Sequence, residues 1–432
     1  MGSGVLRFFS RLIVSAAMGL ALVAAPAAAG PSLDGPVTAT PSASPEPAPG
    51  RVRARMNQRV FDQVWSEVRR DYYDPRLHGV DWNAARASFR PRALAALDDR
   101  RLYGVVNEML ALLDDAHAGA SAPAVARRQD MLRVRRPVLG VTLYPEDGRN
   151  GRYVVERVRA GSPAADAGVH TGWRLEPFDG SGWTPETEVI VGVPVTLDLI
   201  DDAGAARPTT LMPRIMDPTP AFTVDRTRPG VVVLRVEAFE PGLGRWMGAQ
   251  LASLPADNAV VVDLRSNPGG RVAEADALLS CFLPSDRTWA TRTARSGRRI
   301  VMKTEGGCGD LDQPVPNPVA VLVNGQSRSA AELTPAALQE ARRALIVGEH
   351  TPGAVLISQE TSLPDGGRLS LSRADFETSA GVRLEKRGVT PDLLAPTTGA
   401  DRDAGRDPGL DAAIAALAGG GVQASTAPSP AS

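Results

Sequence analysis

The stretch VAVLVNGQSRSAAELTPAALQEARRALIVGEHTPG, residues 319–353, decides the fold. The apolar run from Val319 to Val323 is typical of a buried strand, and the polar turn after it leads to Ser329 at the expected start of a helix. A second apolar run ends at Gly348. Hydrolases place a nucleophilic serine at such strand-to-helix turns, because the free amides of a helix N-terminus stabilise developing negative charge. The stretch therefore predicts a candidate nucleophile in an α/β fold.

The same alternation continues on both sides of this stretch. Strands are expected at Val231 to Val236, Ala259 to Leu264, Val319 to Val323 and Leu345 to Val347, with helices at Leu243 to Leu254, Arg271 to Leu283 and Ala330 to Arg343. Strands that alternate with helices indicate a layered α/β core, which we place at residues 218–417. Pro335 would remove a backbone hydrogen bond inside a helix that begins at Ala330, so a helix that begins at Thr334 is the alternative.

Two other regions precede this core. Residues 51–130 are expected to be helical, because Val60, Val64 and Val68 recur every four residues, as on one helix face. Residues 137–215 change character, with strands expected at Val138 to Leu143 and at Tyr153 to Val158. A chain of 432 residues is also too long for one ordinary compact domain. The sequence therefore predicts an α/β multi-domain protein.

The first 29 residues have the pattern of a signal peptide. A short positive region precedes an apolar run from Leu12 to Ala25, and small residues follow. An uncleaved anchor is the alternative, although the run is short for a bilayer. We expect a periplasmic or secreted protein with no membrane span after signal removal. Residues 30–50 have the composition of a disordered linker, and residues 418–432 that of a disordered tail.

Charge and cysteine content exclude several classes of protein. The chain has 48 basic and 49 acidic residues, so it lacks the basic field of a nucleic-acid-binding protein. Cys281 and Cys308 could form a disulfide in an oxidising compartment, or they could remain two separate thiols. Their spacing fits no zinc motif. We expect no metal and no other cofactor, and an oligomer is compatible with the sequence.

Several blocks together resemble the C-terminal-processing (tail-specific) serine peptidases. They are FDQVWSEVRRDYYDP with GVDW, LLDDAHAG, GVTL with GSPAADAGVHTGW, VVDLRSNPGG, VLVNGQSRSAAE, LIVGEHTPGA, LPDGGRL and GVRLEKRGVTPD. The blocks lie in the expected order between about residues 57 and 395. The resemblance implies a helical N-terminal domain, a PDZ-like domain over residues 137–215, a serine-peptidase core and a polypeptide substrate.

One position separates two mechanisms within this group. The resemblance to the processing peptidases implies a lysine base in the loop after Gly-Glu-x-Thr-x-Gly, but Ala354 occupies that position, and a methyl group cannot accept a proton. The tricorn-like branch uses a serine, a histidine and a glutamate, which match Ser329, His117 and Glu385. The chain departs from tricorn at Ala116, where a serine precedes the histidine.

The resemblance also implies how such residues act. A serine hydroxyl needs a base, and an imidazole that a carboxylate holds in place supplies one near neutral pH. The tetrahedral oxyanion then needs hydrogen-bond donors. The amide of Ala330, directly after the nucleophile, is one candidate, and the amide of Gly269 or Gly270 in the NPGG turn is the other, because a glycine lets the backbone approach the substrate.

The PDZ-like segment would bind a peptide as an added strand. Leu139, Gly140 and Val141 would form the loop whose amides take the terminal carboxylate. Trp173 replaces the acidic residue that usually follows the glycine before it, and Pro177 interrupts the next strand. A domain that only positions substrate or packs on the core is therefore the alternative to a peptide-binding one.

Each candidate site residue also has a structural alternative. Ser329 and Glu332 match a capping box, so the serine could only cap a helix. His117 and Glu385 could be solvated surface residues, and His350 is a rival base. We expect an exported serine endopeptidase that acts on unfolded or C-terminal polypeptide segments. The alternative, which Ala354 supports, is an inactive family member that binds peptides or hydrophobic ligands.

Overall fold

A computed structural model describes most of the chain, namely residues 49–130, 134–145, 153–175, 188–398, 401, 404 and 406–419. The expected signal peptide lies outside the described residues, as do the expected linker up to residue 48 and the expected tail from residue 420. Among the helices that are described, none is both long enough and apolar enough to cross a membrane.

The central sheet of the core contains six strands, in the order β18-β15-β14-β11-β10-β9. All neighbouring pairs are parallel except β9 with β10, which is antiparallel. The strands are β9 (Phe222–Asp225), β10 (Val231–Val236), β11 (Ala259–Asp263), β14 (Val319–Val323), β15 (Leu345–Gly348) and β18 (Leu393–Leu394). The four strands expected from apolar runs are confirmed, each within one residue at its ends.

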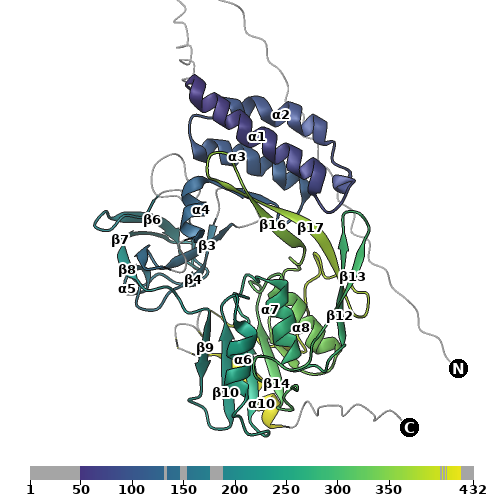
Figure 1. Cartoon of the computed structure of the whole chain (residues 1–432). Helices are drawn as coiled ribbons and strands as arrows, with labels where there is room; N and C mark the ends of the chain where they lie inside the picture. The colour runs from purple at the N-terminus through teal and green to yellow at the C-terminus, as the bar shows by residue number, and fades with distance from the viewer. Residues whose placement is uncertain are drawn as a thin grey trace, which may run out of the picture. The chain divides into compact units, whose positions relative to one another are not determined.

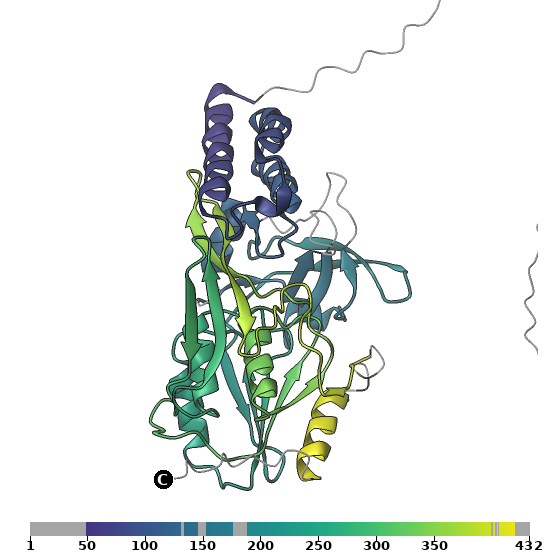
Figure 2. The same cartoon turned by 90° about the vertical axis from the view of Figure 1, so that its right-hand side faces the viewer.

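Both faces of this sheet are covered, which explains why its strands are apolar at consecutive positions. The covering helices are α6 (Leu243–Leu251), α7 (Val272–Ser280), α8 (Ala330–Glu340) and α10 (Pro408–Ala418). Helices α6, α7 and α8 share one apolar cluster with Val232, Val260 and Val321. Helix α10 packs on Val261 and Leu322, which point to the other face. Figure 2 shows α10, in yellow, apart from the other core helices.

The core helices begin where expected or one residue later but end earlier. Helix α8 begins at Ala330 and contains Pro335, so the alternative start at Thr334 is wrong. It ends at Glu340, because Arg342 has a positive φ of 53° that a helix cannot accommodate. Helix α7 ends at Ser280, directly before Cys281, whose sulfur is bonded to Cys308. The expected disulfide is thereby confirmed.

A second, antiparallel sheet has the order β1-β17-β12-β13, and β16 also pairs with β17. Its strands are β1 (Gly119–Ser121), β12 (Thr288–Ala294), β13 (Arg299–Lys303), β16 (Ile357–Ser362) and β17 (Arg368–Thr378). The long strand β17 belongs to two apolar clusters. Its Leu369 and Leu371 pack with the N-terminal helices, whereas its Phe376 packs in the core cluster. Residues far apart in the sequence are joined through this strand.

The helices before β1 are α1 (Arg51–Asp71), α2 (Trp82–Ala95) and α3 (Asp99–Leu110), and they lie side by side in Figure 1. Val60, Val64 and Val68 on α1 are fully buried, as their spacing predicts. Asp81 and Asp98 accept backbone hydrogen bonds at the starts of α2 and α3, so both helices are capped. A single 3-10 turn follows α3, and it leads to the loop that carries His117.

The β-rich part of the chain forms a five-stranded antiparallel sheet in the order β3-β4-β5-β6-β7. Its strands are β3 (Val141–Pro145), β4 (Tyr153–Val158), β5 (Arg174–Leu175), β6 (Val195–Ile200) and β7 (Ala206–Leu211); a separate pair joins β2 (Arg136–Val138) to β8 (Arg214–Met216). The single strand expected from Val138 to Leu143 is therefore wrong. Gly140, with a φ of 91°, breaks it into β2 and β3. Pro177 lies outside the described residues.

Candidate active site

Three loops converge on Ser329 at one edge of the central sheet. Because β11, β14 and β15 are parallel neighbours, the loops that follow them leave the sheet at the same edge. The Arg328 amide donates to the carbonyl of Asn267 in the first loop at 2.9 Å, and the Ser329 amide donates to the carbonyl of Ala354 in the third at 2.7 Å. The serine is thus held between the NPGG turn and the loop after β15, residues 349–356, which we call the glycine loop.

The backbone of Ser329 has a conformation that is rare for a residue with a side chain, with a φ of 55° and a ψ of −120°. Ser329 and Glu332 have a capping-box arrangement, but the serine makes no side-chain cap hydrogen bond at the N-terminus of α8. The Glu332 amide donates instead to the Ser329 carbonyl at 2.8 Å. Ser329 and Glu332 therefore occupy the two positions of the capping box that the sequence predicts.

Glu332 ties the serine turn to the glycine loop. Its fully buried carboxylate accepts hydrogen bonds from the Thr351 hydroxyl at 2.6 Å, from the Gly353 and Ala354 amides at 2.6 and 2.8 Å, and from the Ser329 amide at 3.2 Å. Burial raises the pKa of Glu332, and these hydrogen bonds oppose the rise. The sequence motif signalled only a helix cap, so this wider role was missed.

The lysine position is occupied by a buried alanine whose backbone contacts the serine. The chain has two lysines, Lys303 and Lys386. Lys303 pairs with Asp286 at 3.5 Å, and Lys386 is paired with Asp114. The loop that carries the lysine in the other branch is therefore present, but it has Ala354 at that position. The ammonium groups of both lysines of the chain are paired with the carboxylates of Asp286 and Asp114.

Two backbone amides beside Ser329 are available as donors. A Cβ atom added to Gly269 would lie 2.6 Å from the Ser329 Cβ and 3.1 Å from the Ala330 nitrogen, so the NPGG turn packs directly on the serine. The Gly269 amide is already used, because it donates to the Asn267 Oδ1 at 2.7 Å. Within the described residues, the amides of Gly270 and Ala330 donate no hydrogen bond. Of the two glycines considered for the oxyanion, Gly270 has the free amide.

His117 lies in the loop between α3 and β1. Its amide donates to the Asp115 Oδ1 at 2.8 Å, whereas its Nδ1 is buried and has no partner among the described residues. Burial lowers the pKa of His117, the charge of Asp115 raises it, and the charge of Arg328 lowers it. The histidine is therefore within electrostatic reach of the residue before Ser329. No hydrogen bond joins it to Ser329 or Glu385 in the described part of the chain.

Glu385 is buried near the same loop. Its Oε2 accepts a hydrogen bond from the Val355 amide at 3.0 Å, immediately after the lysine position. Burial raises the pKa of Glu385, and the charge of Asp115 raises it further, although the Val355 hydrogen bond opposes both. The neighbouring ion pair between Lys386 and Asp114 links this segment to the loop of His117. Glu385 is thus within electrostatic reach of Asp115, the acid that also acts on the histidine.

Two buried polar atoms of the histidine loop, the Asp115 Oδ2 and the His117 Nδ1, have no well-formed hydrogen bond among the described residues, and neither has the hydroxyl of Tyr72, which follows α1 and interacts electrostatically with Asp115. Burial raises the pKa of Tyr72, and the charge of Asp115 raises it further. Buried polar atoms are usually hydrogen-bonded, so this group of polar atoms is an unusual feature of the region around His117. Sequence reasoning identified His117 but missed Tyr72 and Asp115.

The β-rich part touches the serine turn through charged side chains. Arg328 pairs with Glu156 of β4 at 3.3 Å, and both side chains are largely buried. Arg157, the next residue of β4, donates to the Ser266 carbonyl at 2.6 Å and pairs with Glu237. Burial raises the pKa of Glu156, and the charge of Arg328 opposes the rise. These contacts join β4 to the loop after β11 and to the serine turn.

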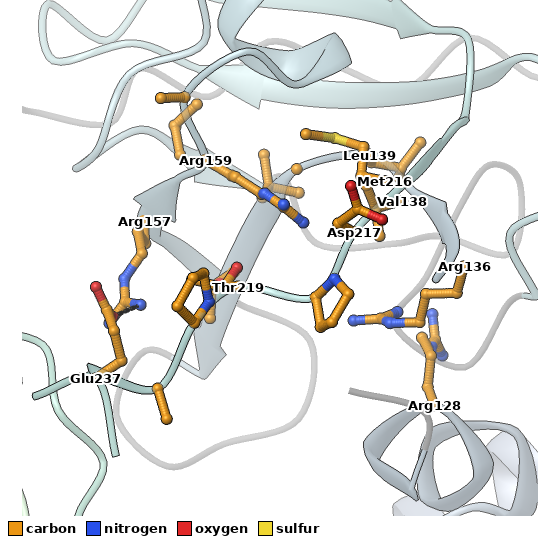
Figure 3. Close-up of a pocket in the computed structure, with 18 of the residues that line it drawn as sticks. Arg128, Arg136, Val138, Leu139, Arg157, Arg159, Met216, Asp217, Thr219 and Glu237 are labelled. Carbon is orange, nitrogen blue, oxygen red and sulfur yellow. Dashed lines mark hydrogen bonds and ion pairs between the residues drawn. The ribbon is translucent and has the colours of Figure 1, made fainter. Parts of the chain in front are cut away.

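Leu139, Gly140 and Val141 line a pocket of about 680 Å³. Among the contacts described above, none joins these three residues to the Ser329 turn. Figure 3 shows Leu139 beside Met216 and Asp217 in this pocket.

The rival base His350 is exposed, and its Nδ1 lies 2.8 Å from the Thr351 carbonyl. The structure therefore brings the NPGG turn, Ser329 and Ala330 together, joins Glu385 to the Val355 amide and places His117 within electrostatic reach of Arg328, and within the described residues it gives His350 no hydrogen bond to the serine.

Known proteins share both the core and the helical region. Residues 230–395 match the sequence model of peptidase family S41, and residues 54–111 match that of the tricorn protease C1 domain. A carboxyl-terminal-processing protease of Picosynechococcus is 27% identical over 375 residues, which cover 78% of this chain and 83% of that protein. A carboxy-terminal-processing protease of Bartonella bacilliformis is 29% identical over 313 residues, covering 69% and 70% of the two chains.

A solved structure shares the fold. The photosystem II D1 C-terminal processing protease superposes with a TM-score of 0.59 at 24% sequence identity, covering 79% of this chain and 93% of that one. The mixed α/β, multi-domain architecture is therefore that of a known protease fold.

Proposed function

Because the chain belongs to the carboxyl-terminal-processing peptidases of family S41 and is a serine-type peptidase, we propose that Ser329 is its nucleophile and His117 its general base. The observation that carries the proposal is the convergence of three loops on a strained serine, beside the free amides of Gly270 and Ala330. The hydroxyl of Ser329 attacks the peptide carbonyl carbon, and the two amides donate to the oxyanion that forms.

His117 takes the proton of the serine hydroxyl and then delivers it to the leaving amine, so that an acyl-enzyme remains for water to hydrolyse. The pKa of His117, lowered by burial and by Arg328, keeps the imidazole neutral and able to accept a proton. The resting histidine makes no hydrogen bond to the serine, so the loop of His117 must move to engage it. Catalytic hydrogen bonds are often long in free enzymes and shorten when substrate binds.

A carboxylate then stabilises the imidazolium. We assign this role to Glu385, which is buried beside the glycine loop, with Asp115 as a second acid. Asp115 already raises the pKa of His117 and holds its amide, so it restrains the histidine before any rearrangement. The protein would then belong to the branch of the family that lacks the catalytic lysine, since Ala354 occupies the lysine position.

The substrates in this proposal are unfolded or C-terminal polypeptide segments, cleaved after export to the periplasm or outside the cell. We propose a signal peptide over residues 1–29, a helical domain over 51–130, a PDZ-like domain over 137–215 and a peptidase core over 218–417. In the PDZ-like domain, Leu139, Gly140 and Val141 would take the peptide end. The turn at Gly140, with its positive φ, supports this assignment, because it places a loop directly before β3, the edge strand of its sheet.

A fluorophosphonate probe tests the mechanism. We expect it to label the wild-type protein, to fail with Ser329→Ala, and to label His117→Ala far more slowly, because the probe reacts only with an activated serine. His350→Ala is the matched control, since the exposed His350 should not affect labelling. Undiminished labelling of Ser329→Ala would exclude Ser329, and equal labelling of His117→Ala and wild type would exclude His117.

An inactive family member that binds peptides or hydrophobic ligands is the second candidate. The absent lysine at Ala354 and the unpartnered Nδ1 of His117 favour it. Cleavage of an unfolded substrate such as casein separates the two candidates. Cleavage that Ser329→Ala abolishes supports the peptidase, whereas intact casein in the presence of wild-type protein, together with no probe labelling, supports the binding protein.

A further inference from the structure

The pocket beside the edge strand β3 has more positive than negative charge. Its lining includes strand and turn residues on both sides of Gly140, the end of β4, and the segment that follows β8. The charged residues among them are Arg128, Arg136, Arg157, Arg159, Arg235, Asp217, Glu237 and Glu240. Most of these charged side chains have an ion-pair or hydrogen-bond partner within the protein. The side chains without such a partner indicate what the pocket could bind.

The paired charges are those nearest the core. Arg157 pairs with Glu237, and Arg235 pairs with the same carboxylate at 2.6 Å and with Asp263 at 3.4 Å. Asp217 lies 2.7 Å from the Nε of Arg135. Asp217 and Glu237 are therefore already occupied by Arg135, Arg157 and Arg235, and Glu240 and Arg128 also have interaction partners within the protein.

Arg136 and Arg159 differ from those arginines. Within the described residues neither has an ion pair or a side-chain hydrogen bond, and Figure 3 shows their guanidinium groups directed into the pocket from two sides. Partial burial lowers the pKa of Arg136, and the charge of Arg159 lowers it further, so the two guanidinium groups repel each other. Two like charges that face one cavity are stabilised when an anion binds between them.

The backbone around these arginines suits an extended peptide. Among the described strands, β3 (Val141–Pro145) pairs only with β4, so its other edge can accept an added strand. Gly140 turns the chain directly before this edge. Arg136 precedes the turn and Arg159 follows β4, so both guanidinium groups lie at the end of the strand where a peptide terminus would stop.

We propose that this pocket selects polypeptides with an acidic side chain next to a free carboxyl terminus, with Arg136 and Arg159 sharing the two carboxylates. The inference rests on the proposed peptide-binding role of the loop at Leu139, Gly140 and Val141, and adds a substrate class to it. A neutral or basic residue beside the terminus leaves one guanidinium uncompensated. Acidic ends are therefore recruited to the peptidase in preference to neutral ones.

Fluorescence anisotropy tests the selection with the full chain carrying Ser329→Ala, so that no peptide is cleaved. The probes are labelled peptides of one sequence that end in Ala-Glu-Ala or in Ala-Gln-Ala, each with a free or an amidated terminus. We expect the acidic peptide to bind about fivefold more tightly than the neutral one in dilute buffer, with the difference shrinking as salt is added. Amidation should weaken both peptides.

Charge-removing variants locate the selection. Arg136→Gln and Arg159→Gln should each remove most of the difference between the acidic and neutral peptides. Arg174→Gln, which changes an exposed arginine of β5 outside the pocket, is the matched control and should keep it. Equal affinity for the two free peptides, no binding of either, or a preference that survives both pocket variants would each overturn the proposal.

The outcome is separable from that of the proposed chemistry. Probe labelling of Ser329 in the wild-type background needs no peptide, so labelling without acidic selection would reject only this inference. Acidic selection without labelling would reject the catalytic proposal and keep the pocket as a peptide site. The selection is also distinct from general attraction to acidic chains, because Arg174→Gln removes the same net charge.

Discussion

Replacing Gly269 by alanine should disable the serine without unfolding the protein. The added Cβ would lie 2.6 Å from the Ser329 Cβ and 2.8 Å from the Arg328 carbonyl oxygen. Ordinary carbon contacts need 3.5 Å or more, so the serine turn and the NPGG turn must separate by about 1 Å. A misplacement of about 1 Å at a reacting group can cost about 100-fold in rate. We therefore expect fluorophosphonate labelling of Gly269→Ala to slow by about that factor.

Gly366 provides a matched control for the backbone cost. Gly269 has a φ of 94° and Gly366 a φ of 93°, so an alanine is equally strained at both positions. The strain amounts to about 1–2 kcal/mol of stability at each site. At Gly366 the added Cβ meets only the Pro123 Cβ, at an ordinary 3.9 Å. The two variants share the backbone strain and differ in the displacement of Ser329.

The assay combines labelling rate with urea unfolding. Both variants should lose a similar free energy of unfolding from backbone strain, with some further loss in Gly269→Ala from the contact, whereas Gly366→Ala should label within a few-fold of wild type. The reasoning is refuted if folded Gly269→Ala labels as fast as Gly366→Ala. In that case the serine that reacts with the probe would not be the one packed against the NPGG turn.

Three further predictions concern the base, the loop anchor and the disulfide. Because burial lowers the pKa of His117 below its usual 6.5, labelling should fall with a midpoint below pH 6.5 as the imidazole is protonated; a midpoint above 6.5 would contradict the assignment. Glu332→Gln should lower the free energy of unfolding by about 1–3 kcal/mol, because its amide group would face backbone donors, and an unchanged urea midpoint would argue against the loop anchor. Replacing Cys281 and Cys308 together by alanine should cost about 3–4 kcal/mol for a separation of 27 residues, measured as a lower Tm, and an unchanged Tm would contradict it.

The strands of the core could be predicted from the sequence because their signal is local. The run from Val319 to Val323 is buried on both faces, and a strand with both faces buried must be apolar at every position. The turn that carries Ser329 could be predicted for the same reason, because the chain must leave the sheet directly after the apolar run of β14. The helix ends were less predictable. Helix α8 ends because of a positive φ at Arg342, and an arginine gives no sequence signal for that conformation.

The hydrogen-bond partners of the site could not be predicted, because they join loops that lie far apart in the chain. The Gly269 amide is consumed by Asn267 two residues away, which only the turn geometry reveals. The pairing of Arg328 with Glu156 depends on how the β-rich part meets the core across 172 residues. The sequence alone does not show which distant acid a charged residue beside the nucleophile will pair with.

Ala354 shows why the missing lysine leaves the rest of the site intact. The carbonyl of residue 354 accepts the Ser329 amide, and its own amide donates to Glu332, so the loop contributes to the serine turn through its backbone. A change of side chain at 354 leaves both hydrogen bonds in place, and with them the free amides of Gly270 and Ala330. In the proposed peptidase the base therefore comes from another segment of the chain. We propose His117 for this role, because its pKa responds to the charge of Arg328, the residue directly before Ser329, and because its Nδ1 has no hydrogen-bond partner among the described residues.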